Sequence, residues 1–128
     1  MKCTEDLTLD RCQIRVGAVY MPPVGSALDQ RAGVFECVKK VKADTPKEVC
    51  VVFGGDWNSH IGRDGVQGRQ ALLQPSSVGG KQMLGWLRSE GIWDNLNIVD
   101  HGVPLRNRGT WYHNRMKNLY EIDYFIAS

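Results

Sequence analysis

The chain has 128 residues, of which 42% are hydrophobic and 23% are charged, and its formal net charge is +2. This length suits one globular domain with a sizeable core, and this composition excludes a disordered tail. The small net charge gives no argument for nucleic-acid binding by itself, so such an argument depends on where the charges lie. We expect a single domain over residues 1–128.

Cysteine spacing and hydropathy indicate an intracellular, soluble protein. The chain has four cysteines, Cys3, Cys12, Cys37 and Cys50. Their spacing matches neither paired zinc ligands nor a redox Cys-x-x-Cys unit, so we expect free thiols. Residues 1–12 hold no apolar stretch that could serve as a secretory signal, and the longest apolar run, 49–53, is too short to span a membrane. We therefore expect a nuclear or cytoplasmic location and no membrane contact.

The first periodic segment predicts a strand. Residues 13–20 alternate apolar side chains with others, and this alternation places Ile14, Val16 and Ala18 on one face, as in a half-buried strand. Two prolines at 22–23 end the segment. We expect the apolar face to pack on the core.

A helix and a buried strand follow. Ser26 and Asp29 resemble a capping box, and apolar residues recur at helical spacing over 28–41. Residues 49–53 are continuous, apolar and rich in valine, which predicts a strand covered on both faces. The pattern is strand, helix, strand.

The second half continues with a helix and short strands. Residues 81–90 fit a helix that Gly91 caps at its C-terminus. Strand candidates lie at 96–99, 110–113 and 122–126. This order of elements indicates an α/β layered fold.

The segment with the most chemical content is 51–62, VVFGGDWNSHIG. We expect its strand to deliver Asp56 and Asn58 onto the loop just past the strand's C-terminal end, where open α/β sheets place ligand groups. A carboxylate can accept a proton or help to hold a metal, and an amide can donate to a phosphate oxygen, so the pair suits phosphodiester cleavage. The alternative is a turn in which both side chains only cap backbone groups.

Several segments resemble one known family. Residues 54–62 (GGDWNSHIG) resemble the Gly-Asp-Phe-Asn-Ala-His-Ile-Gly signature of the endonucleases encoded by non-LTR retrotransposons, which belong to the endonuclease/exonuclease/phosphatase family. Residues 19–23 are similar to the family's Tyr-x-Pro strand end. Residues 109–113 (GTWYH) and 121–126 (EIDYFI) resemble its Thr-Trp and Gln-Ile-Asp-Tyr pair. The resemblance covers about 14–128.

The resemblance implies a layered α/β sandwich of the deoxyribonuclease-like type, present as roughly its C-terminal half. Asp56 would be the carboxylate that activates the attacking water, and Asn58 would bind the scissile phosphate. Tyr20 would donate a hydrogen bond to that phosphate. Asp123 would orient a catalytic histidine or help to hold Mg²⁺ or Mn²⁺. The alternatives are that Tyr20 packs at a strand end and that Asp123 is an exposed strand residue.

A basic stretch lies next to the Thr-Trp segment. Between Leu105 and Leu119 the sequence has no acidic residue and four basic ones, Arg106, Arg108, Arg115 and Lys117. Such a stretch suits a phosphate backbone and favours DNA as substrate, with a solvated loop as the alternative. Trp111 could touch the substrate, whereas we expect the other tryptophans in the core.

Two kinds of position carry no functional assignment. We treat His60, His101 and His113 as ordinary polar surface residues, because loop histidines usually are. Glu121 stands where the family usually has Gln, and we read this as a surface-like change.

The resemblance also implies missing parts. Family members are about twice as long, with an upstream half that supplies an Asn and a metal-binding Glu, and they end in an Asp-His pair. No glutamate of this chain matches that ligand, so the metal ligands stay unknown. We expect an incomplete domain, derived from a retrotransposon, that is inactive or weak alone and associates with itself through an exposed sheet face. The alternatives are a non-catalytic binding module and a phosphatase of a small phosphate ester or phosphoinositide.

Overall fold

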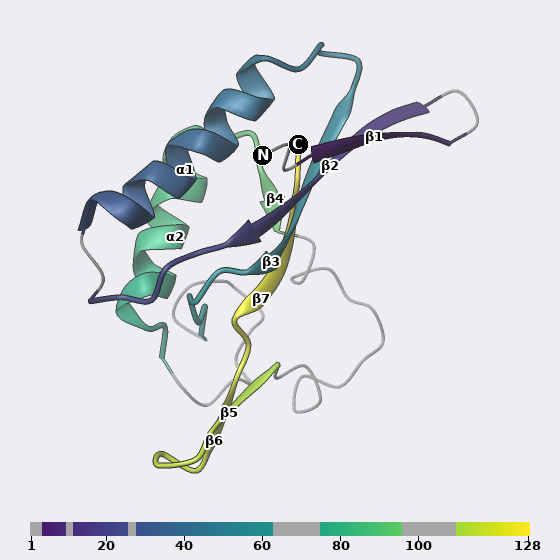
Figure 1. Ribbon diagram of the computed structural model, residues 1–128. Coiled ribbons are helices and arrows are strands. Elements are labelled where there is room, and N and C mark those ends of the chain that lie inside the picture. Colours follow the sequence, from purple (N-terminus) through teal and green to yellow (C-terminus); the bar gives the residue numbers. More distant parts are fainter. Residues whose placement is uncertain (1–3, 10–11, 26–27, 63–74, 96–109) are drawn as a thin grey trace.

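The structure is a computed structural model that describes residues 4–9, 12–25, 28–62, 75–95 and 110–128 (Figure 1). In chain order its elements are β1 (Thr4–Leu9), β2 (Cys12–Tyr20), α1 (Leu28–Ala43), β3 (Cys50–Asp56), α2 (Val78–Glu90), β4 (Asp94–Asn95), β5 (Trp111–His113), β6 (Asn118–Tyr120) and β7 (Asp123–Ala127). Five strands form one sheet in the order β1-β2-β3-β7-β4, while β5 and β6 form a separate hairpin. The α/β layered fold predicted from the sequence is confirmed.

Both described helices lie on one side of the large sheet (Figure 1). Strands β2 and β3 are parallel, so α1 is the crossover between them, while β1–β2, β3–β7 and β4–β7 are antiparallel. The core between helices and sheet is built from side chains such as Phe35, Val38, Phe53, Tyr124 and Ile126, each at most 5% exposed. The opposite side of the sheet carries no described helix.

Helix α2 begins three residues before the predicted start because its cap is Ser77. The Ser77 side chain accepts a hydrogen bond from the Gly80 N–H at 3.0 Å. At the other end Gly91 adopts the left-handed conformation (φ 67°), and its N–H donates to the Leu87 carbonyl at 3.0 Å. The predicted glycine cap is confirmed.

Sequence patterns missed three short or polar strands. Strand β1 pairs with β2 although its alternation is mostly polar, and Asp6 on β1 binds Arg15 on β2 at 2.8 Å. This hydrogen bond from the guanidinium to Asp6 raises the pKa of Arg15. Strands β4 and β6 have two and three residues, too few to show a period. The predicted strand 96–99 and the cap residue Ser26 lie outside the described residues.

The prediction for the faces of β2 is wrong. Val19 and Gly17 are buried toward the helices, whereas Ile14, Val16 and Ala18 lie on the other face and are half-buried or exposed. A Cβ on Gly17 would lie 2.2 Å from a ring carbon of Phe53, which shows how closely this face packs. The side that the helices cover carries Arg15 as well as Gly17 and Val19, so the apolar pattern of β2 favoured the wrong face.

Candidate functional site

Three of the predicted site residues lie side by side on adjacent strands. Tyr20 at the end of β2 pairs with Asp56 at the end of β3, and Asp56 pairs with Asp123 at the start of β7. Directly paired residues project on the same face of a sheet, with Cβ atoms roughly 5 Å apart in an antiparallel pair. This face is the one opposite the helices, because the neighbouring Tyr124 is fully buried on the helix side. Tyr20, Asp56 and Asp123 therefore lie side by side on this face.

Asp56 belongs to the strand, not to a loop beyond it. Strand β3 continues through Gly54 and Gly55 and ends at Asp56. Gly55 has φ 144°, and a Cβ there would lie 2.0 Å from the Val19 carbonyl oxygen. Gly55 therefore lets β3 run close beside β2, and Gly54 leaves room for the Phe125 ring of β7.

Asp56 and Asn58 form the local turn that the alternative interpretation described. The Asn58 N–H donates to Asp56 Oδ1 at 2.8 Å, and Asn58 Nδ2 donates to the Met21 carbonyl at 2.7 Å. Asn58 has φ 42°, a conformation that asparagine tolerates better than most residues. Asp56 Oδ2 makes no hydrogen bond to the described residues. One carboxylate oxygen of Asp56 and one amide hydrogen of Asn58 are thus not used in the turn.

Trp57 anchors this turn in the core. Its side chain is fully buried, its Nε1 donates to the Tyr124 carbonyl at 3.1 Å, and its backbone N–H donates to the Ile122 carbonyl at 2.9 Å. Its ring stacks with Phe35 of α1 at 6.4 Å between centroids. Trp57 was predicted as core, and this is confirmed.

Arg31 of α1 binds the segment after the turn, the segment after β2 and helix α2. Its guanidinium donates to Ser59 Oγ at 2.8 Å, to the Pro22 carbonyl at 2.5 Å and to Gln82 Oε1 at 2.7 Å. Arg31 is 4% exposed, and this burial lowers the pKa of its guanidinium. The sequence analysis missed Arg31, although it lies three residues after Leu28 and four before Phe35, on the apolar side of the helix.

Thr110 of the Thr-Trp segment fixes the start of β7. Its hydroxyl oxygen accepts hydrogen bonds from the backbone N–H groups of Ile122 at 3.1 Å and Asp123 at 3.3 Å. Its own N–H donates to the Tyr120 carbonyl at 2.9 Å. The two resembling segments, 109–113 and 121–126, therefore meet beside Asp123.

His60 and Glu121 are buried, so their interpretation as surface positions is wrong. Each is 2% exposed. The Glu121 N–H donates to His60 Nδ1 at 3.3 Å, and the His60 ring meets Tyr120 edge-on at 5.0 Å. The loop after Asn58 folds back under β7, which a local pattern does not reveal.

The hairpin β5–β6 projects from the end of the sheet where β7 begins (Figure 1). Its described part exposes Tyr112 (50%) and Met116 (57%), together with the basic residues Arg115 and Lys117. Trp111 lies in β5, but its side chain, like all of Arg106 and Arg108, is outside the described part of the chain. The basic stretch thus has two described cations, which lie at the tip of the hairpin, at the opposite end from Thr110 and Asp123.

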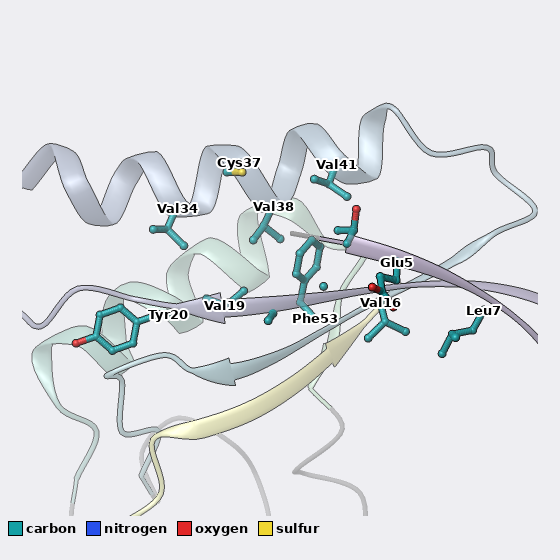
Figure 2. Close-up of a pocket in the computed structure, with 13 residues that line it drawn as sticks. Glu5, Leu7, Val16, Val19, Tyr20, Val34, Cys37, Val38, Val41 and Phe53 are labelled. Carbon is teal, nitrogen blue, oxygen red and sulfur yellow. The ribbon is translucent and has the colours of Figure 1, made fainter. Parts of the chain in front are cut away.

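An open apolar groove of about 840 Å³ runs between α1 and the strands β1 and β2 (Figure 2). Val34, Val38 and Val41 of the helix line it from one side and Phe53 from the other. Tyr20 stands at one end of the groove, whereas Asp56 and Asp123 do not line it. The groove is therefore separate from the two paired carboxylates.

The described residues do not form a resident metal site. No group of three or more His, Cys, Asp and Glu side chains within them is arranged to hold a metal ion. Asp56 and Asp123 are neighbouring carboxylates, but Asp56 Oδ1 already accepts the Asn58 N–H. Any Mg²⁺ or Mn²⁺ would need ligands besides these two side chains.

Comparisons with known proteins place the fold. No family model matches the chain, and no curated protein matches it. Among solved structures it is similar to an endonuclease/exonuclease/phosphatase family protein from Leptotrichia buccalis C-1013-b, with a TM-score of 0.56 and 11% identity. The match covers 97% of this chain and 40% of that chain. The chain has part of a deoxyribonuclease-like fold.

No helix in the described residues is long and apolar enough to cross a membrane.

Helix α2 packs closely on the loop at His60, and substitutions of glycines in α2 test this contact. A Cβ on Gly80 would lie 1.8 Å from the His60 carbonyl oxygen, whereas Gly85 in the same helix has nothing within 4 Å. We expect Gly80→Ala to destabilise the chain by about 1–3 kcal/mol, because backbone must shift to admit the methyl group. Gly85→Ala should stabilise it by about 0.5–1 kcal/mol through helix propensity.

Urea denaturation of the two variants measures both effects. Equal stability of Gly80→Ala and wild type would contradict the close approach between α2 and the His60 carbonyl.

Proposed function

We propose that the chain supplies part of a site that hydrolyses phosphodiester bonds in DNA. The observation that carries the proposal is the row of Tyr20, Asp56 and Asp123 across three adjacent strands. The row lies in a fold similar to that of a protein whose family name includes endonucleases and phosphatases. The similarity spans only 40% of that protein, so the proposed activity is that of a partial site.

The chain's own side chains have separate roles in the proposed reaction. Asp56 accepts a proton from the attacking water through Oδ2, while the Asn58 N–H holds Oδ1 and fixes the carboxylate plane. Asn58 can donate its second amide hydrogen to a phosphate oxygen. Tyr20 is 68% exposed and pairs with Asp56 on the neighbouring strand, where its hydroxyl can donate to the phosphate. Asp123 orients a neighbouring group of the complete site.

The hairpin β5–β6 favours a polyanion over a small phosphate ester. Arg115 and Lys117 are exposed at its tip, beyond the end of the sheet that carries the proposed site, where they can bind phosphates farther along a nucleic-acid strand. Arg106 and Arg108 in the same basic stretch would extend this contact. A small ester would not reach charges distributed along the hairpin.

Nicking of supercoiled plasmid tests the catalytic part of the proposal. We expect slow nicking that needs added Mg²⁺ or Mn²⁺, because the described residues do not form a resident metal site. Asp56→Ala and Asn58→Ala should lower the rate at least tenfold, whereas Asp44→Ala, an exposed aspartate after α1, should leave it unchanged. Equal nicking by wild type and Asp56→Ala would contradict the proposal.

Binding of a labelled DNA duplex tests the substrate class. Replacing both Arg115 and Lys117 by glutamate should weaken binding at least tenfold and reduce the slope of log K against log salt by about 2. The control replaces Lys40 of α1 and Lys47 in the loop after α1, both exposed, by glutamate. If DNA binds as predicted but no nicking occurs at any metal concentration, the non-catalytic binding module is the better description.

A further inference from the structure

The groove between α1 and the strands β1 and β2 has apolar walls (Figure 2). On α1 the walls are formed by Val34, Val38 and Val41, which we call the valine row. These residues lie about one helical turn apart, so the row extends over roughly 10 Å of the helix. Val19 and Phe53 of the sheet also line the groove. This shape suits an elongated apolar molecule.

The size and polarity of the groove favour an alkyl chain. Its volume of about 840 Å³ falls within the range of small-molecule sites, about 300–1,000 Å³. Besides the Cys37 thiol, the polar side chains among the described lining residues are Thr4, Glu5 and Tyr20. A molecule rich in amide or hydroxyl groups would find few partners here and would lose its hydrogen bonds to water on entering. An alkyl chain has no such loss.

The two ends of the groove differ in charge. Tyr20 stands at one end, and Glu5 lies toward the other end, beyond Phe53 and near Val16 (Figure 2). Glu5 is the single charged residue among the described residues that line the groove, so none of them is basic. Its side chain is exposed and makes no ion pair with the described residues. A carboxylate beside an apolar groove is complementary to a cation at the end of an apolar chain.

We propose that the groove binds a single-chain amphiphile with a protonated amine at one end, which is the chemistry of a long-chain alkylamine. The alkyl chain lies along the valine row and Phe53, and the ammonium group pairs with Glu5. Because the groove holds the chain between a helix and the sheet, the ligand enters as a single free molecule and not as part of a bilayer. The proposal does not depend on the proposed reaction, because Asp56 and Asp123 do not line the groove.

Cys37 reports directly on whether the groove is occupied. It is an exposed free thiol that lines the groove, whereas the exposed thiol of Cys12 does not line it. At neutral pH and below its micelle concentration, saturating dodecylamine should slow the alkylation of Cys37 by N-ethylmaleimide at least threefold, because the bound chain covers the thiol. The alkylation rate of Cys12 should stay the same. Peptide mapping by mass spectrometry after short reaction times measures both rates.

Ligands of equal chain length test the charge of the head group. An exposed ion pair is worth up to roughly fivefold in affinity and a like-charge contact costs about as much, so dodecylamine should bind about tenfold more tightly than dodecanoate. Isothermal titration calorimetry measures both affinities. Glu5→Gln should weaken the binding of dodecylamine about fivefold. The control Glu48→Gln, at an exposed position before β3, should leave both affinities unchanged.

Filling the groove tests where the alkyl chain lies. Val34→Trp places a large ring in the groove and should abolish the binding of dodecylamine, whereas Val24→Trp, at an exposed loop position, should not. If circular dichroism shows that Val34→Trp is unfolded, Val41→Trp replaces it. Shortening the ligand to octylamine removes methylene groups that are each worth up to about fourfold in affinity, so octylamine should bind at least tenfold more weakly.

Five results would overturn the proposal. Equal affinity for dodecylamine and dodecanoate, or unchanged amine binding by Glu5→Gln, would show that Glu5 does not receive the head group. Unchanged alkylation of Cys37 at saturating dodecylamine would show that the chain lies elsewhere. Protection of Cys37 that rises with protein concentration alone would assign the groove to a second copy of the chain. Tighter binding of an extended valine peptide with one lysine would assign it to a polypeptide.

Discussion

Trp57→Ala is expected to be the most damaging single substitution in the described chain. The side chain is fully buried between the turn at Asp56 and helix α1, and replacing a buried tryptophan by alanine typically costs about 3–5 kcal/mol. The free energy of unfolding of a domain is about 5–15 kcal/mol in total, so this loss removes a large part of it. A large decrease in the urea midpoint should result.

Two companion variants assign the effect of Trp57→Ala to its cause. Trp57→Phe keeps most of the apolar contact but loses the donor to the Tyr124 carbonyl, and should cost about 1–3 kcal/mol. Tyr112→Ala removes a half-exposed aromatic ring from the hairpin and should change stability by no more than about 0.5 kcal/mol. A Trp57→Ala variant as stable as Tyr112→Ala would contradict the central position of Trp57 in the core.

The sequence predicted the elements in which the apolar pattern extends over enough residues to be recognised. The apolar spacing over 28–41 gave α1, and the valine run at 49–53 gave the first half of β3. Strand β1 was missed because its partner β2, and not its own apolar residues, holds it in the sheet. The predicted helix-facing side of β2 was also wrong, because the covered side contains Arg15, which binds Thr45, and Gly17, which leaves room for the Phe53 ring.

The sequence predicted which residues form the candidate site, but it did not predict their hydrogen bonds. The resemblance assigned Tyr20, Asp56 and Asp123 to one phosphate site, and the strand register places them side by side. Their roles in catalysis stay predictions. The hydrogen bonds of Asp56 and Asn58 within the turn depend on φ 42° at Asn58, which no spacing reveals. The burial of Glu121 depends on a loop that returns from a distant part of the chain.

Removing the guanidinium of Arg31 is expected to have the second-largest effect. Arg31→Met keeps the length of the side chain but leaves Ser59 Oγ and the Pro22 carbonyl without their donor. A buried acceptor that loses its partner costs about 1–3 kcal/mol, and the Pro22 carbonyl is only partly buried, so we expect a total of about 2–4 kcal/mol. Gln82 is exposed and can bond to water instead, so its loss adds little.

Arg31→Lys and Lys40→Met complete the test of Arg31. Lysine keeps the positive charge but has no planar fork that reaches several acceptors, so Arg31→Lys should retain only part of the stability. Lys40→Met removes an exposed cation from the same helix and should change the free energy of unfolding by no more than about 0.5 kcal/mol. In the variants that remain folded, the Asn58 amide resonance should shift in Arg31→Met but not in Lys40→Met, because Ser59 follows Asn58 directly. Equal stability of Arg31→Met and Lys40→Met, with an unchanged Asn58 resonance, would show that Arg31 does not hold the segment of Asn58 and Ser59 in place.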